Sequence, residues 1–239
     1  MNLKKLFKMS SPIQSKDPIQ VSYYDSVLRK SDIESVNEGN WLTDAVITFF
    51  YTYLEQSPSN TGLHGILLLE PSMIHLLRQS TYPASLQGVL PNALYDANYV
   101  FLPVNDHLSH TAGGNHWSLL VYSRPNSSFF YYDSYNNSNY HHAKNTAECF
   151  IHFLGLPPST LRVMPTPQQK NGNDCGVFVI SLSESLFHAI IATPTATSTH
   201  MPIPVPPNQI WTIEPTRVYP ASVQRARIKN IIKSLRKGR

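Results

Sequence analysis

Residues 169–191, QKNGNDCGVFVISLSESLFHAII, join a polar, glycine-containing turn to a long apolar run that begins directly after Cys175. The run predicts a buried helix with Cys175 at its N-terminus. A thiol is a good nucleophile only when it is ionised, and the partial positive charge at a helix N-terminus favours the ionised form. The stretch therefore indicates a reactive cysteine; the simpler alternative is a small core residue at a helix start.

Composition and charge are those of a globular protein with a sizeable core. The chain has 239 residues, 41% of them hydrophobic, and a net charge of +4, with basic residues gathered near both ends. This distribution argues against a nucleic-acid-binding face across the fold. The 2 cysteines imply no disulfide framework, and we find neither a secretory signal nor an apolar stretch of membrane-spanning length. We therefore expect a cytoplasmic or nuclear monomer with no membrane or nucleic-acid partner.

Helical spacing of apolar residues recurs in three further regions before the cysteine. From Trp41 onward, WLTDAVITFFYTYLEQ predicts a helix with Thr43 or Asp44 as N-cap, and EPSMIHLLRQS predicts a second that opens with Pro71. HHAKNTAECFIHFLG predicts a third helix that closes at Gly155.

Short aromatic and β-branched runs between these helices predict strands. They are YVFLPV (99–104), HWSLLVYS (116–123), SFFYYDS (128–134) and LRVMP (161–165). The turn RPNS joins the second and third of them, which predicts a hairpin. Helices that flank a small sheet indicate an α+β fold.

The two ends of the chain differ from its centre. Residues 1–20 are polar and predict a disordered segment, whereas residues 21–239 predict a single domain. Within that domain, residues 192–208 are rich in Pro and Thr and predict a surface excursion. Residues 222–237 predict a basic helix with an apolar stripe docked on the domain and a solvated basic face; the stripe consists of Val223, Ile228, Ile231, Ile232 and Leu235.

Three other residues could complete a catalytic site with Cys175. His116 starts a predicted strand and is the best general base, and Asp133 ends the paired strand, where it could orient the imidazole. Gln169 could direct an amide N–H at the oxygen that becomes negative during acyl transfer. Each residue taken singly also has a purely structural interpretation, but together they favour nucleophilic catalysis.

The combination resembles a known family. In order, GGNHWSLLVY, FFYYDS and QKNGNDCGVFV resemble the His-Trp, Asp and Gln…Asp-Cys-Gly motifs of the ubiquitin-like-protein-specific cysteine proteases, the sentrin/SUMO-specific protease type. NWLTD resembles the Trp-Leu-x-Asp motif of that family. YYDSVLRKSDIESV, HAKNTAECFIHFLG and IEPTRVY look most like its deneddylase member.

The resemblance implies a papain-like cysteine protease fold with a small mixed sheet, and it implies roles for seven residues. Cys175 would be the nucleophile, His116 the base, Asp133 its orienter and Gln169 a donor to the oxyanion. Trp41 and Trp117 would form a narrow channel for a C-terminal Gly-Gly, and Asp44 would bind substrate just upstream. For Trp41, a core aromatic is the alternative.

The implied function is a thiol protease that cleaves after the Gly-Gly of a ubiquitin-like modifier, to mature a precursor or to release the modifier from lysine. A Nedd/Rub-type modifier is favoured, and SUMO is the alternative. Asp133 and NWLTD disfavour a related acetyltransferase, and the intact set of Cys175, His116, Asp133 and Gln169 disfavours a modifier-binding protein with little turnover. The scattered histidines and Cys149 lack the grouping of a zinc site, so we expect no metal and no cofactor.

Overall fold

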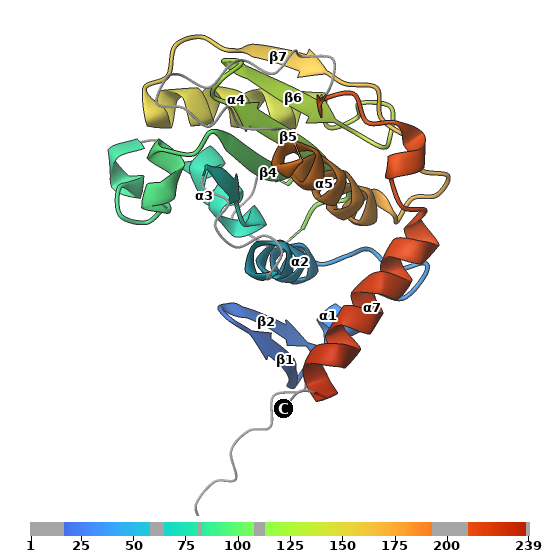
Figure 1. Ribbon diagram of the computed structural model, residues 1–239. Coiled ribbons are helices and arrows are strands. Elements are labelled where there is room, and N and C mark those ends of the chain that lie inside the picture. Colours follow the sequence, from blue (N-terminus) through green and yellow to red (C-terminus); the bar gives the residue numbers. More distant parts are fainter. Residues whose placement is uncertain (1–16, 58–64, 81–82, 108–112, 193–209, 238–239) are drawn as a thin grey trace, which may run out of the picture.

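A mixed five-stranded sheet forms the centre of the molecule (Figure 1). The computed structural model describes residues 17–57, 65–80, 83–107, 113–192 and 210–237. The strand order is β3-β4-β5-β6-β7, in which β4-β5 and β5-β6 are antiparallel and the two outer pairs are parallel. Helices on both faces complete the α+β architecture that the sequence predicts.

The helices and strands follow one another in an order that mixes the two types throughout. Their bounds are β1 Ile19–Tyr23, β2 Ser26–Arg29, α1 Lys30–Ser35, α2 Asp44–Gln56, β3 Ile66–Leu68, α3 Pro71–Gln79, β4 Tyr99–Asn105, β5 Trp117–Ser123, β6 Ser128–Tyr132, α4 Tyr140–Leu154, β7 Thr160–Val163, α5 Cys175–Ile191 and α7 Ala221–Lys237, with short 3₁₀ turns at Pro83–Leu86, Asn92–Tyr95 and Pro215–Arg217.

The two faces of the sheet bury two separate hydrophobic clusters. Because side chains alternate along a strand, Leu119 and Val121 of β5 pack with α2 and α5, whereas Leu120 and Tyr122 pack with α3 and α4. Figure 1 shows α2 between α5 and the small β1-β2 sheet. The helix that begins at Cys175 is therefore held against the sheet on one side and against α2 on the other.

Local signals in the sequence locate most of these elements correctly. Helix α2 begins at Asp44 after the N-cap Thr43, α3 begins at Pro71, and α4 ends at Gly155, whose positive φ of 60° suits glycine. β5 and β6 form the predicted hairpin. The sequence reasoning missed β3 and the hairpin of β1 and β2.

The N-terminal boundary expected from the sequence is wrong by a few residues. Strand β1 begins at Ile19, inside the segment expected to be disordered, and the carboxylate of Asp17 accepts hydrogen bonds from the Ser31 backbone N–H and hydroxyl. Residues 1–16 lie outside the described residues.

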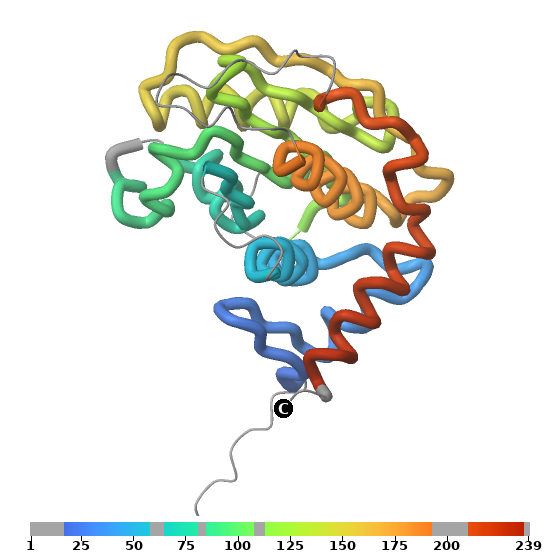
Figure 2. Tube along the Cα trace, in the orientation of Figure 1, coloured from blue at the N-terminus to red at the C-terminus, as the bar shows by residue number. Residues whose placement is uncertain are grey.

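The C-terminal helix α7 begins one residue before the expected position and lies beside the N-terminal strand β1 (Figure 2). Ile228 and Ile232 are buried as the apolar stripe predicts, but Val223 is 44% exposed. The prediction of a solvated basic face is wrong for Arg225, which is 3% exposed. Apart from Ala192, the Pro/Thr-rich segment lies outside the described residues.

Within the described ranges, no helix combines the length and the apolar composition needed to cross a membrane.

Candidate active site

Cys175 is the first residue of α5 and is buried, with an exposed fraction of 2%. The next residue, Gly176, packs tightly against Leu42 and Trp117. A Cβ at Gly176 would lie 3.0 Å from Cβ of Leu42 and 3.5 Å from Cδ1 of Trp117. The glycine of the Asp-Cys-Gly sequence therefore allows the start of α5 to approach the residues that follow Trp41.

His116 and Asp133 lie next to the paired ends of β5 and β6. His116 immediately precedes β5 and Asp133 immediately follows β6, so the antiparallel register brings the two side chains together. The distance between His116 Nε2 and Asp133 Oδ1 is 2.7 Å. The pairing that strand ends alone suggested is thus present as a hydrogen bond.

The His116 imidazole has a raised pKa. Burial alone would lower its pKa, but hydrogen bonds and charge interactions with Asp133 and Cys175 outweigh burial and raise the pKa from 6.5 to about 9. Because Nε2 is bonded to Asp133, Nδ1 is the ring nitrogen that remains for exchange of a proton with Cys175. The His116 imidazole therefore interacts with both the Asp133 carboxylate and the Cys175 thiol.

The Asp133 carboxylate is fully buried and accepts several hydrogen bonds. Oδ2 accepts from the Tyr131 hydroxyl at 2.6 Å and from the Asn139 N–H at 3.0 Å, and Oδ1 also accepts from the Tyr135 N–H at 2.8 Å. Burial would raise the pKa of this carboxyl, but the bonds from His116, Tyr131 and Asn139 hold it below its ordinary value. Asp133 is therefore charged and fixed in position beside the imidazole.

Asn139 is a supporting residue that the sequence reasoning missed. It is fully buried, and its side chain donates to the Val104 carbonyl at 2.8 Å and to Ser118 Oγ at 2.9 Å. Asparagine is a favoured N-cap residue, and Asn139 precedes the run that forms α4. That signal indicates the helix start but not the contact with Asp133.

Gln169 lies on the turn that leads to Cys175. Its Oε1 accepts from the Ser134 hydroxyl at 2.7 Å, and its Nε2 donates to the Asn171 carbonyl at 2.7 Å. A primary amide has two N–H groups, and the Asn171 bond uses one of them. Ser134, the residue after Asp133, therefore fixes the orientation of the Gln169 side chain.

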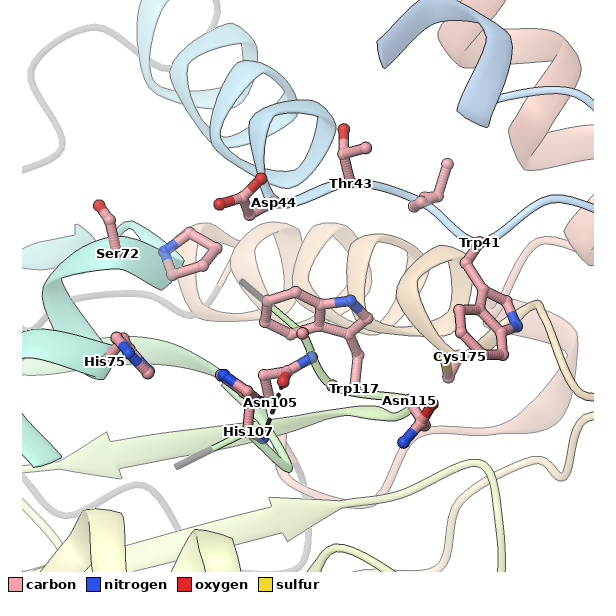
Figure 3. Close-up of a pocket in the computed structure, with 14 residues that line it drawn as sticks. Trp41, Thr43, Asp44, Ser72, His75, Asn105, His107, Asn115, Trp117 and Cys175 are labelled. Carbon is pink, nitrogen blue, oxygen red and sulfur yellow. Dashed lines mark hydrogen bonds between the residues drawn. The ribbon is translucent and has the colours of Figure 1, made fainter. Parts of the chain in front are cut away.

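A cleft of about 450 Å³ opens beside Cys175. Four predicted site residues line it, namely Trp41, Asp44, Trp117 and Cys175, whereas His116, Asp133 and Gln169 do not. In Figure 3 the Cys175 side chain lies between the two indole rings. Because His116 is 9% exposed, its interaction with Asp133 is largely shielded from solvent.

Trp41 is a surface residue and not the core aromatic that was the alternative. It is 51% exposed, and its indole N–H donates to the Gly172 carbonyl at 2.7 Å. This bond ties the loop before α2 to the turn before Cys175. The orientation of the indole is thus set from the same turn that carries the thiol.

The far end of the cleft is lined by polar residues to which the sequence reasoning gave no substrate-binding role. The imidazoles of His75 and His107 are stacked, with centroids 5.9 Å apart, and Ser72 and Asn105 lie beside them (Figure 3). No local pattern joins α3 to the end of β4, so these residues could not be grouped from the sequence.

Comparison with known proteins identifies the family to which this chain belongs. Residues 40–203 match the Ulp1 protease family, C-terminal catalytic domain. The chain belongs to the Ulp1 protease family. As a member of that family it is a cysteine peptidase.

Named relatives and solved structures agree with the family. Sentrin-specific protease 8 of Rattus norvegicus is 38% identical over 173 residues, which is 71% of this chain and 80% of that protein. NEDD8-specific protease 1 of Schizosaccharomyces pombe is 34% identical, over 77% of this chain and 45% of that protein. The crystal structure of a de-sumoylating protease has a TM-score of 0.65 and 16% identity, with 93% of this chain and 92% of that one covered. This structural likeness supports the fold assignment.

Proposed function

We propose that this chain hydrolyses the bond that follows the C-terminal Gly-Gly of a ubiquitin-like modifier, with a Nedd8-type modifier favoured. The observation that carries the proposal is the 2.7 Å bond between His116 and Asp133 beside Cys175 at the start of α5. The choice of modifier rests on the NEDD8-specific proteases among the relatives, from Schizosaccharomyces pombe and Arabidopsis thaliana.

In the proposed reaction His116 accepts and donates protons, and Cys175 forms the covalent bond to the substrate. His116 accepts the thiol proton, and the thiolate attacks the carbonyl carbon of the terminal glycine. As the tetrahedral intermediate collapses, His116 gives its proton to the leaving amine and a thioester remains. Water, deprotonated by His116, then releases the modifier with a free carboxyl group and restores the thiol.

Two charges develop during this reaction, one on His116 and one on the substrate oxygen, and neighbouring groups stabilise both. Asp133 stays ionised and favours the imidazolium form of His116, because the carboxylate is hydrogen-bonded to that ring. The negative oxygen of the tetrahedral intermediate accepts hydrogen bonds from backbone N–H groups at the start of α5 and from the remaining amide N–H of Gln169.

The cleft explains why Gly-Gly would be selected. Trp41 and Trp117 line the cleft beside Cys175, and two indoles can close on a peptide backbone only where the substrate has no side chains. Asp44 also lines the cleft and could bind a basic side chain or the backbone upstream of the glycines. We therefore assign substrate binding to these three residues and propose a site of action in the cytoplasm or nucleus.

A panel of fluorogenic substrates tests the proposal. Nedd8, SUMO and ubiquitin, each with a C-terminal fluorophore, should be cleaved by the wild type with the highest kcat/KM for Nedd8. Cys175→Ala should remove turnover of every substrate while binding persists. Fastest cleavage of SUMO would instead support the alternative specificity, and binding without turnover by the wild type would support a modifier-binding protein.

A covalent probe provides a second test. A Nedd8 with a C-terminal propargyl group should label Cys175 and leave Cys149 unmodified, because burial raises the pKa of the Cys149 thiol. Cys149→Ser is the matched control and should be labelled like the wild type. Labelling that persists in Cys175→Ala would contradict the assignment.

A further inference from the structure

A guanidinium group from the C-terminal helix lies buried behind the active site. Arg225 of α7 is 3% exposed, and its donors reach two separate segments of the chain. On the first segment, Nη1 donates to the Ser35 and Asn37 carbonyls at 3.2 and 2.9 Å, and Nη2 donates to the Asn40 carbonyl at 2.7 Å. Asn40 is the residue before Trp41, so Arg225 fixes the loop that presents this indole.

The second segment is the turn that carries the nucleophile. Nη2 of Arg225 donates to the Asn173 carbonyl at 3.2 Å and to Asp174 Oδ1 at 2.8 Å, and Nε donates to the same Oδ1 at 3.1 Å. Asp174 immediately precedes Cys175. One side chain therefore joins the Trp41 loop to the Cys175 turn, next to the 2.7 Å bond by which Trp41 joins Gly172.

The arginine also determines where the Asp174 carboxylate lies. Asp174 is the N-cap residue of α5, a position at which aspartate usually accepts a hydrogen bond from the first N–H groups of the helix. Here its side chain makes no such capping bond; Oδ1 is bonded to Arg225, and Oδ2 accepts from Asn171 Nδ2 at 2.8 Å. The first N–H groups of α5 are thus spared a negatively charged acceptor beside Cys175.

We propose that Arg225 is a positioning residue for the active site. It sets the distance between the Trp41 loop and the Cys175 turn, and it keeps the Asp174 carboxylate away from the start of α5, where a substrate oxyanion would compete for the same N–H groups. The proposal rests on the proposed function for its catalytic consequence, because substrate turnover is the property that these two effects support.

The same helix offers a matched control. Arg227 also joins α7 to α5, through Glu184 with Nη1···Oε2 and Nη2···Oε1 distances of 2.6 and 2.7 Å, and it stacks on Tyr219. Glu184 lies in the middle of α5, well after Cys175. Arg225→Gln and Arg227→Gln each remove an arginine–carboxylate pair of α7, with the N-cap of α5 in the first case and with α5 itself in the second, but only Arg225→Gln affects contacts of the cleft.

The variants are compared in the full chain with Cys149→Ser as background. At a temperature where all variants are folded by their melting curves, Arg225→Gln should lower kcat/KM about 10²-fold, mainly in kcat, as expected for a small misplacement of reacting groups. Arg227→Gln should change kcat/KM by less than about threefold while it lowers Tm. Adding Asp174→Asn to Arg225→Gln should restore about tenfold of the loss, because the uncompensated carboxylate is then absent.

Alkylation by iodoacetamide supplies a readout that needs no modifier. Arg225→Gln should slow carbamidomethylation of Cys175 about tenfold, and Arg227→Gln should leave it unchanged, because the environment of the thiol differs only in the first variant. This readout separates the two proposals. If the wild type cleaves no modifier, the proposed function fails, while the alkylation rates still decide the role of Arg225.

Equal losses of kcat/KM in Arg225→Gln and Arg227→Gln, with equal alkylation rates, would show that Arg225 acts only through overall stability and would overturn the proposal. Failure of Asp174→Asn to restore activity would overturn the part that concerns the carboxylate. Should Arg225→Gln not fold, Arg225→Lys replaces it. Lysine keeps the charge beside Asp174 but cannot reach both segments, so kcat/KM should fall about tenfold.

Discussion

Two carboxylates lie near Cys175, Asp133 fully buried and Asp174 partly exposed, and they have different kinds of partner. Asp133 is bonded to His116, a group whose proton can leave within the ordinary pH range, whereas Asp174 is bonded to Arg225, whose charge is permanent. The first pair can take part in proton transfer, and the second can only fix geometry. Charge and burial therefore do not by themselves distinguish a carboxylate with a catalytic role from one with a structural role. What distinguishes the two is whether the partner residue can lose its proton.

Gln169 connects the two carboxylates. Its Oε1 accepts from Ser134, the neighbour of Asp133, and its Nε2 donates to Asn171, whose side chain donates to Asp174. The turn before Cys175 is thus held from both sides. Four substitutions test how the Asp133 side of this turn differs from the Asp174 side. They follow from the largest expected effect on turnover to the smallest.

His116→Ala should have the largest effect, a fall in kcat of about 10⁴-fold. Without the imidazole, Cys175 has no partner to take its proton and none to protonate the leaving amine. Steady-state cleavage of the preferred fluorogenic modifier, with Tm as a control for folding, measures this. Turnover like the wild type at neutral pH would remove His116 from the mechanism.

Gln169→Ala should lower kcat by about 10²-fold with a modest change in KM, because an oxyanion donor acts in the transition state more than in the bound substrate. Ser134→Ala, which removes the hydroxyl bonded to Gln169 Oε1, is the matched variant and should cost less. A rise in KM alone for Gln169→Ala would instead indicate a role in substrate binding.

Asp133→Asn should lower kcat/KM about tenfold at pH 7.5, because loss of the carboxylate lowers the pKa of His116 and leaves less of the imidazole protonated. In the wild type, kcat/KM should fall as pH rises through about 9, the raised pKa of His116. The asparagine variant should show this fall at lower pH. An unchanged alkaline limb would contradict the assignment of that limb to His116.

The raised pKa of His116 also predicts how stability depends on pH. A group whose pKa is higher in the folded state stabilises the fold fully below its unfolded value of 6.5, and this contribution is lost as pH rises through about 9. The free energy of unfolding of the wild type should therefore decrease across that interval more than that of His116→Ala.

Asp174→Asn should have the smallest effect on turnover, less than about threefold in kcat of the folded enzyme, because the amide still accepts from Arg225 and adds no charge beside Cys175. Its cost should appear in stability, about 3 kcal/mol, since a buried guanidinium loses its counter-ion. Urea denaturation measures this cost. If Asp174→Asn lowered kcat as much as Gln169→Ala does, the contrast in function between Asp133 and Asp174 would be contradicted.

The sequence predicted those parts of the site that depend on local patterns. The apolar run after Cys175 predicted α5, and the strand patterns placed His116 and Asp133 at the paired ends of a hairpin. The register of a hairpin joined by a short turn is fixed by neighbouring residues, so the contact between these two side chains could be anticipated. Their 2.7 Å bond is the outcome of that local pairing.

Strands that depend on partners far along the chain left weaker signals in the sequence. β3 has three residues and pairs in parallel with β4 across a long connection, and β1 begins at Ile19, inside the segment 1–20 that was expected to be disordered. Short strands without a long alternating pattern become stable only when the rest of the fold covers them. The polar end of the cleft at His75 and His107 depends on that same packing.

The sequence by itself determined the position of Cys175 at the start of its helix and the histidine–aspartate hairpin, because each depends on side chains whose chemistry and spacing can be read along the chain. The tertiary structure alone decided the place of Arg225, which the helical pattern assigned to a solvated face. Its acceptors include the carbonyls of Ser35 and Asn37, 190 and 188 residues away, and that of Asn173. Every residue has a backbone carbonyl, so such acceptors leave no trace in the sequence, and only the folded chain shows which of them surround a buried charge.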